Sequence, residues 1–256
     1  MMNLPDNLKP FAEELARLSG EVLLRYHGRP KIGVELKTDD SPVTIADREA
    51  EAVMREHIMR HFPDHGIIGE EFGNLNTDAE WVWSLDPMDG TKSFMTNVPL
   101  YTTLIALAYR GEPVLGIIHQ PVLKQLVMGD GAVTTLNGDP VRVRETTSLN
   151  EATLLTTCFK NVMKYQDFGV FQELITQVPI VRTWGDGYGY LSVATGWADI
   201  MCDPIVNPWD IAPLKPIIEG AGGVISDWFG GSAVGANSCI AATPALHEKV
   251  IRMLNK

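Results

Sequence analysis

The stretch Trp81-Val82-Trp83-Ser84-Leu85-Asp86-Pro87-Met88-Asp89-Gly90-Thr91-Lys92-Ser93-Phe94 decides the prediction of the fold. Its apolar start predicts a buried strand, which ends in two acids, a glycine turn and a hydroxyl. Pro87 fixes the backbone angle φ, and Gly90 permits a tight bend. This turn can direct the carboxylates of Asp86 and Asp89 toward one point. By itself the motif is also typical of a capped surface turn, but its place at a strand end favours a site.

Further acids stand at similar places along the chain. Glu70 and Glu71 follow a short apolar strand, so Glu70 and Asp86 are expected at one edge of the fold. Asp210 opens a helix, where an Asp is also a good N-cap. Asp47 lies on the first turn of another helix, where a solvated acid is ordinary. Together the acids predict a site for divalent cations, which in pairs about 3.5–4 Å apart cleave phosphate esters.

Composition bounds the class of protein. The 256 residues suffice for one large domain, and we expect a single unit over residues 1–256 built from two tightly packed halves, about 1–145 and 146–256. Hydrophobic residues at 45% and charged residues at 21% are ordinary for a globular protein. The net charge of -11 argues against nucleic acid or an anionic membrane as a general partner.

The three cysteines and the N-terminus indicate the compartment. An odd cysteine count without a CxxC pattern argues against a disulfide framework or a thiolate zinc site. The N-terminus lacks a basic-then-apolar signal segment, and no apolar run has the length to span a bilayer. We therefore expect a cytoplasmic protein.

Periodicity predicts a layered α/β fold. In the first half, helical spacing predicts helices over residues 7–27 and 44–61, the second N-capped by Thr44. Strand-like runs with short turns then predict an antiparallel meander. In the second half strands and helices alternate, with helices near residues 168–176 and 188–195, which predicts a mixed sheet. The meander strands are residues 100–109, 114–119, 125–128 and 132–136.

These motifs, taken in order, resemble the inositol monophosphatase family. The match includes Glu70-Glu71, the Asp86 to Thr91 motif, Trp209-Asp210 before residues 219–223, and Lys37 with residues 40–47. It covers nearly the whole chain. The resemblance implies an αβαβα sandwich of the inositol monophosphatase and sugar phosphatase type. It also implies a homodimer, and a Mg²⁺-dependent phosphomonoesterase for a small phosphorylated metabolite, often inhibited by lithium.

The resemblance also implies a ligand set for two to three Mg²⁺ ions per site, with Mn²⁺ as an alternative ion. Glu70, Asp86 and the Met88 carbonyl would hold the first ion. Asp86, Asp89 and Asp210 would hold the second, and Glu70 would reach a third, weaker ion through water. The family usually has Ile or Leu where this chain has Met88. Because only the carbonyl would ligate, this departure changes little.

The catalytic group implied by the resemblance is Glu70, Thr91 and Asp47. Thr91, paired with Asp47, would orient the attacking water, whose acidity the metal raises. The main-chain N–H groups of Gly90 and Thr91, at the start of a short helix, would receive the phosphate.

The second half resembles the histidinol-phosphate phosphatase branch of the family. Inositol-specific members usually carry a small residue at the position of Asp186 and Glu at that of Asp203. This branch usually has Cys where the chain has Gly187. The stretches that carry the resemblance are residues 182–190, 194–196, 203–210 and 226–228.

Two carboxylates beside a metal site suit a cationic substrate. Histidinol phosphate carries an ammonium and an imidazole, which Asp186 and Asp203 could bind through charge-assisted hydrogen bonds. Tyr188 and Asn207 are further candidates for the substrate pocket. Alternatively, Asp186 caps the helix near Tyr188 and Asp203 only precedes a proline turn.

Other functions fit the sequence less well. An aspartyl-phosphate enzyme with a D-x-D-G-T motif needs one residue between its two acids, whereas Asp86 and Asp89 are separated by two. An EF-hand loop needs an acid or Asn where Met88 stands. An inositol-1-monophosphatase or a broader small-molecule phosphatase stays an alternative, a nucleotide 3′-phosphatase is less favoured, and the non-enzyme alternative is an acidic cation-binding module.

Overall fold

The structure is a computed structural model that describes residues 4–29, 33–36 and 42–256. Lys37 and residues 40–41 of the predicted N-terminal motif lie outside the described residues. Within the described ranges no helix combines the length and the apolar character needed to cross a membrane.

Helices in the described part of the chain form three layers. The predicted N-cap Thr44 is confirmed, because its hydroxyl accepts a hydrogen bond from the Ala46 N–H at 3.1 Å. In chain order the helices are α1 Leu8–Tyr26, α2 Ile45–His61, α3 Thr91–Met95, α4 Phe159–Tyr165, α5 Phe168–Thr176, α6 Asp186–Ala194, α7 Pro208–Gly220 and α8 Pro244–Leu254, with a short 3-10 turn at Leu149–Glu151.

The strands form two large sheets and one small pair. The eight-stranded sheet has the order β10-β9-β8-β7-β6-β5-β3-β4, and the five-stranded sheet has the order β12-β11-β13-β15-β14. The strands are β1 Glu35–Leu36, β2 Pro42–Val43, β3 Gly66–Gly69, β4 Gly73–Leu75, β5 Trp81–Asp89, β6 Thr102–Tyr109, β7 Glu112–Gln120, β8 Gln125–Gly129, β9 Thr134–Leu136, β10 Asp139–Val141, β11 Thr153–Leu155, β12 Ile180–Arg182, β13 Ile200–Asp203, β14 Val224–Ser226 and β15 Cys239–Ala242.

Strand pairing confirms the predicted division into an antiparallel first half and a mixed second half. In the eight-stranded sheet only β3 and β5 pair in parallel among the described strands. In the five-stranded sheet β11 pairs in parallel with both β12 and β13, whereas β15 pairs antiparallel with β13 and β14. Strand β10 and helix α4 were not predicted from the sequence. Both are short, so little hydrophobic periodicity marks them.

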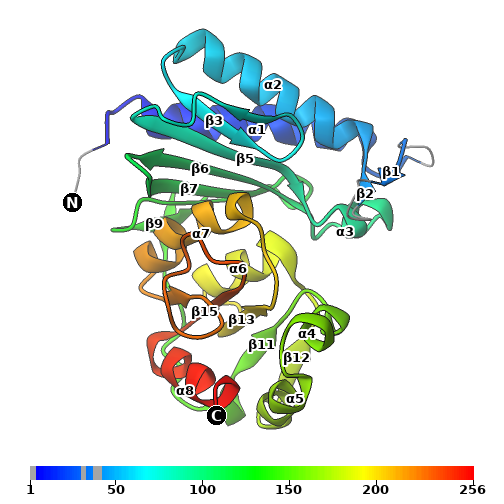
Figure 1. Ribbon diagram of the computed structural model, residues 1–256, viewed down its shortest axis with the longest axis vertical. Coiled ribbons are helices and arrows are strands. Elements are labelled where there is room, and N and C mark those ends of the chain that lie inside the picture. The colour runs from blue at the N-terminus through cyan, green and yellow to red at the C-terminus, as the bar shows by residue number, and fades with distance from the viewer. Residues whose placement is uncertain (1–3, 30–32, 37–41) are drawn as a thin grey trace.

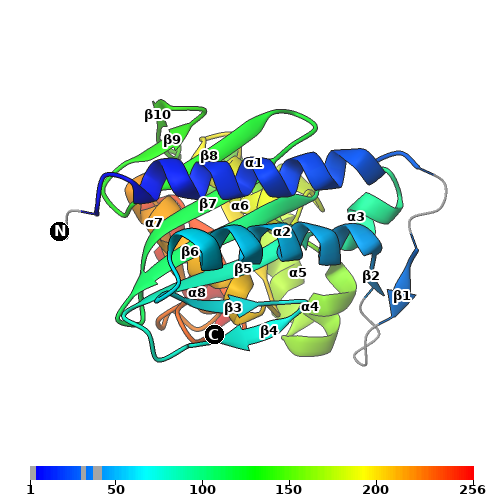
Figure 2. The same cartoon turned by 90° about the horizontal axis from the view of Figure 1, so that it is seen from above.

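The layers alternate as predicted. Helices α1 and α2 cover one face of the eight-stranded sheet, α6 and α7 lie between the two sheets, and α4, α5 and α8 cover the far side (Figure 1). Figure 2 shows α1 and α2 side by side across the large sheet. The predicted αβαβα sandwich is confirmed.

Helix α7 lies with its main chain directly on the large sheet. A Cβ atom at Gly116 of β7 would overlap the Pro213 carbonyl, and one at Gly129 of β8 would lie 2.5 Å from the Ile217 Cα. Glycine is therefore required at both strand positions. This contact joins the two halves of the chain, since α7 also packs on β14.

We predict that Gly116→Ala destabilises the protein by about 1–3 kcal/mol, because the added methyl group forces α7 away from β7. Equilibrium unfolding in urea, followed by circular dichroism, measures this loss. Gly169→Ala is the matched control. It lies in α5, where an added Cβ would meet only the Asp167 carboxylate oxygen at 3.2 Å, so stability should change by less than about 1 kcal/mol. Equal stability of Gly116→Ala and wild type would contradict the proposed close packing.

Candidate active site

A cavity of about 390 Å³ opens where strand ends of the large sheet meet the second half of the chain. From the first half, Glu70 follows β3 and Asp89 ends β5. From the second half, Asp186, Asp203 and Asp210 line the same cavity. Parallel pairing of β3 and β5 brings the first two acids to one edge, because carboxyl ends of parallel strands meet there.

Asp86 is the most deeply buried acid of this group, with 2% of its surface exposed. The register between β5 and β6 shifts between Asp86 and Asp89. The side chains of these two residues therefore do not follow the regular alternation of a strand. The Asp86 carboxylate accepts a hydrogen bond from the Met88 N–H at 2.9 Å. Burial raises the pKa of Asp86 well above its usual value, and the charges of Glu70, Asp89 and Asp210 raise it further.

Asp210 and Asp89 are perturbed in the same way. Asp210 is the third residue of α7 and not its N-cap, which is Asn207, so the predicted N-cap position is wrong. The Asp210 carboxylate accepts from the Asn207 N–H at 2.7 Å in a capping box. Burial raises its pKa to about 7, with Glu70 contributing. The Asp89 carboxylate accepts from the Gly187 N–H. Burial raises its pKa well above the usual value, followed by the charges of Asp186 and Asp210.

These acids form the donor set that a hard cation requires. Carboxylate oxygens are the ligands preferred by Mg²⁺, and a dication would remove the repulsion that raises the pKa values of Asp86, Asp89 and Asp210. Each of these three carboxylates accepts one main-chain N–H, which leaves further lone pairs for a cation. No set of three or more His, Cys, Asp and Glu side chains among the described residues already has metal-ligand geometry.

Asp47 and Thr91 meet beside this cluster, as the sequence resemblance implies. The Thr91 hydroxyl lies 3.4 Å from the Asp47 carboxylate and 3.2 Å from the Met88 carbonyl, and it can donate to either. Asp47 also accepts from the Thr44 N–H at 2.7 Å and forms a capping box at the start of α2. Burial raises the pKa of Asp47 to about 7. Gly90, with φ of 90°, precedes Thr91 in the left-handed region.

Asp203 and Asp186 line the same cavity from the second half of the chain. Asp203 ends β13 and accepts from the Thr157 N–H at 3.1 Å and the Tyr190 hydroxyl at 3.0 Å. Burial raises the pKa of Asp203 to about 7 and that of Asp186 to about 6, the latter opposed by the Lys92 ammonium. Asp186 is the first residue of α6, and Gly185 is the N-cap without a side-chain cap. The alternative role of Asp186 as helix cap is therefore wrong.

The two further candidates for the substrate pocket, Asn207 and Tyr188, differ in whether they line the cavity. Asn207 lines the cavity. Tyr188 does not, because its ring packs against the core between the two sheets. Two residues later, Tyr190 reaches the cavity instead. This chain has Gly187 where the branch usually has Cys. The reason is steric, because a Cβ at this position would overlap the Thr102 hydroxyl.

Glu51 is a residue that the sequence reasoning missed. It is fully buried in α2 and accepts from the N–H groups of Glu71 at 2.7 Å and Phe72 at 3.1 Å. It also pairs with Arg55 at 3.1 Å. Glu51 thereby holds the turn after Glu70. Its place four residues after Asp47, on the buried face of the helix, is the sequence signal that could have revealed it.

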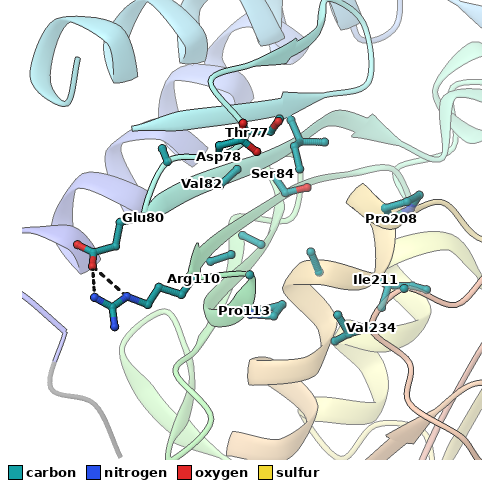
Figure 3. Close-up of a pocket in the computed structure, with 17 residues that line it drawn as sticks. Thr77, Asp78, Glu80, Val82, Ser84, Arg110, Pro113, Pro208, Ile211 and Val234 are labelled. Atoms are coloured by element: carbon teal, nitrogen blue, oxygen red, sulfur yellow. Dashed lines mark hydrogen bonds and ion pairs between the residues drawn. The ribbon is translucent and has the colours of Figure 1, made fainter. Parts of the chain in front are cut away.

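A second cavity of about 610 Å³ lies beside the first turn of α7 and the large sheet (Figure 3). Its wall is mostly apolar, with Val82, Ile211 and Val234 among the lining residues. At its rim the Arg110 guanidinium pairs with Glu80 at 2.6 Å. The smaller cavity, with its clustered acids, is therefore the candidate active site.

Comparison with known proteins agrees with the fold. The family model described as "Inositol monophosphatase family" matches residues 4–256. An inositol monophosphatase from Zymomonas mobilis has a similar solved structure, with a TM-score of 0.88 and 32% identity over 100% of both chains. The match places the chain among the phosphoric monoester hydrolases. It belongs to the inositol monophosphatase family, whose enzymes are generally Mg²⁺-dependent.

Two curated relatives carry different names. The chloroplastic bifunctional phosphatase IMPL2 of Arabidopsis thaliana is 40% identical over 228 residues, which cover 88% of this chain and 65% of the plant protein. This chain thus spans slightly less than two thirds of that relative. A histidinol-phosphatase of Chlorobaculum parvum is 38% identical over 242 residues, with 94% of this chain and 93% of the relative covered.

We predict that Glu51→Ala lowers the free energy of unfolding by about 3–5 kcal/mol. The change leaves two main-chain N–H groups unpaired and removes the counter-ion of the Arg55 guanidinium, which keeps its bond to the Gly73 carbonyl. Urea unfolding measures the loss. Glu56→Ala is the control on the same helix. Its exposed pair with Arg60 should make it change stability by less than about 1 kcal/mol. Similar stabilities for the two variants would show that the turn after Glu70 does not depend on Glu51.

Proposed function

We propose that residues 1–256 act as one Mg²⁺-dependent phosphomonoesterase that hydrolyses L-histidinol phosphate to L-histidinol and phosphate, as a homodimer. The observation that carries this proposal is the arrangement of carboxylates within one cavity. Glu70, Asp89 and Asp210 line the cavity near the buried Asp86, and Asp186 and Asp203 line it as well.

In this proposal, Glu70, Asp86 and the Met88 carbonyl would hold one Mg²⁺, and Asp86, Asp89 and Asp210 would hold a second. Glu70 would reach a third, weaker ion through water. When bound, Mg²⁺ would supply a water molecule of lowered pKa and neutralise charge on the phosphate.

Thr91 and Asp47 position the attacking water. The Thr91 hydroxyl proton points to the Asp47 carboxylate or to the Met88 carbonyl, so the Thr91 oxygen can accept a hydrogen bond from water and orient it. The N–H groups of Gly90 and Thr91 receive the phosphate. Glu70, beside them in the cavity, completes the catalytic group.

Asp186 and Asp203 select the substrate. Burial raises the pKa of both groups, so their ionised forms are costly without a cationic partner. The ammonium and imidazole of histidinol phosphate supply that partner, whereas a neutral polyol does not. Asn207 offers an amide at the same cavity. The name of the Chlorobaculum relative supports this substrate.

A second candidate function is hydrolysis of inositol 1-phosphate. The similarity to the Zymomonas enzyme favours it. Phosphate release from L-histidinol phosphate and inositol 1-phosphate, measured side by side with Mg²⁺, Mn²⁺ or EDTA, decides between the two. We expect release to require the divalent ion and to favour histidinol phosphate. Preference for the inositol ester would contradict the substrate proposal and leave the proposed metal site intact.

Asp89→Asn should lower kcat/KM at least about 100-fold on every phosphate ester, because a proposed ligand of the second ion loses its charge. The melting temperature should not fall, since the variant also removes repulsion among buried carboxylates. Asp78→Asn, an exposed acid outside the cavity, is the matched control and should keep wild-type activity. A near-normal rate for Asp89→Asn would exclude Asp89 from the metal ligands.

Asp203→Asn should raise KM for histidinol phosphate roughly 10- to 100-fold, because a hydrogen bond to a charged group contributes about 1.5–3 kcal/mol. For glycerol 2-phosphate, a small ester without a cationic group, the change should be less than about threefold. Steady-state kinetics on both esters measure the difference. Equal losses on the two substrates would contradict the pairing of Asp203 with the substrate cation.

A further inference from the structure

Thr157 lies between the two carboxylates that the proposed function assigns to substrate selection. In the five-stranded sheet β11 is the middle of three parallel strands, with β12 on one side and β13 on the other. Asp203 ends β13, and the chain after β12 leads to Asp186. Thr157 comes two residues after the end of β11. The carboxyl ends of parallel strands meet at one edge, so the three residues converge there.

Hydrogen bonds connect Thr157 to both acids. Its N–H donates to Asp203 Oδ1 at 3.1 Å, and its hydroxyl oxygen accepts from the Asp186 N–H at 2.8 Å. Thr157 also lowers the pKa of the Asp203 carboxyl against the effect of burial. One residue thus holds both acids, with its main-chain N–H on the Asp203 carboxylate and its hydroxyl oxygen on the main chain of Asp186.

The main chain around Asp186 depends on this contact. Asp186 has φ of 51°, a left-handed conformation that costs a non-glycine residue roughly 1 kcal/mol or more. Gly185 lies against Thr157 so closely that a Cβ would overlap the threonine main chain and hydroxyl. On the other side, the Gly187 N–H donates to Asp89. The Asp186 backbone is therefore held at both ends, by Thr157 and by Asp89.

We propose that Thr157 is a positioning residue for substrate specificity, whose hydroxyl holds the Asp186 main chain and so fixes the position of the Asp186 carboxylate relative to that of Asp203. The inference rests on the proposed function, since it assigns Thr157 to the selection of the cationic end of the substrate. The hydrogen bonds of Thr157 lead to Asp203 and Asp186, which the proposed function assigns to substrate selection. Its removal therefore weakens recognition of the cation more than it weakens cleavage of the phosphate ester.

Thr157→Val tests this directly, because valine keeps the shape and removes the hydroxyl. We expect KM for histidinol phosphate to rise about 10-fold, as loss of hydrogen bonds of about 1–1.5 kcal/mol implies, with kcat within about twofold of wild type. Both constants for glycerol 2-phosphate should stay within about twofold. Thr157→Ser should restore the wild-type KM. Thr157→Ala, a smaller hydroxyl-free variant, should match Thr157→Val and serves if valine prevents folding.

The neighbouring Thr156 provides a matched control. It is fully buried, and its hydroxyl has no hydrogen-bond partner in the structure. Thr156→Val should therefore leave both KM values unchanged. Equal losses on the two esters for Thr157→Val, or a serine variant as defective as valine, would overturn the positioning role.

Wild-type kinetics separate this inference from the function on which it rests. If wild type shows no preference for histidinol phosphate over inositol 1-phosphate and glycerol 2-phosphate, the proposed function fails and the role of Thr157 fails with it. If wild type prefers histidinol phosphate and Thr157→Val keeps that preference, the inference about Thr157 alone is overturned. Loss of the preference in valine and alanine variants, with rescue by serine, supports both.

Discussion

The close contact between α7 and the large sheet is the constraint on which the rest of the structure depends. Because Gly116 and Gly129 lack side chains, the helix main chain rests directly on β7 and β8. The first turn of α7 carries Asp210, and this seating brings its carboxylate within interaction distance of Asp86 at the end of β5. A contact between backbones thus assembles an acidic cluster from residues more than a hundred positions apart.

Electrostatic repulsion then shapes the cavity. Buried carboxylates raise one another's pKa values, and the protein offsets this with main-chain N–H donors. Met88, Gly187 and Asn207 donate to Asp86, Asp89 and Asp210 respectively. The same N–H groups fix the strand end and the two helix starts. The same hydrogen bonds therefore position the acids and stabilise their charged forms.

Much of the fold could be predicted from local patterns. The helix over Ile45–His61 and its Thr44 cap follow from helical periodicity and a capping sequence. Short elements such as α4 escaped prediction, because a few residues carry too little periodicity. The start of α6 was placed two residues late, since a left-handed Asp186 held by Thr157 is a tertiary effect. Tyr188 was assigned to the pocket for the same reason, because a shift of two positions turns another side of the helix toward the cavity.

By itself, the sequence determined the family and the acids at the ends of β3 and β5, since each depends on neighbouring residues or on motif order. Only the tertiary structure decided which distant groups meet. The strand order β12-β11-β13 places Thr157 between Asp186 and Asp203. Likewise, the packing of α2 on the sheet places Glu51 under the Glu70 turn. Strand order and helix seating arise from long-range burial of apolar surface, which no local pattern of residues specifies.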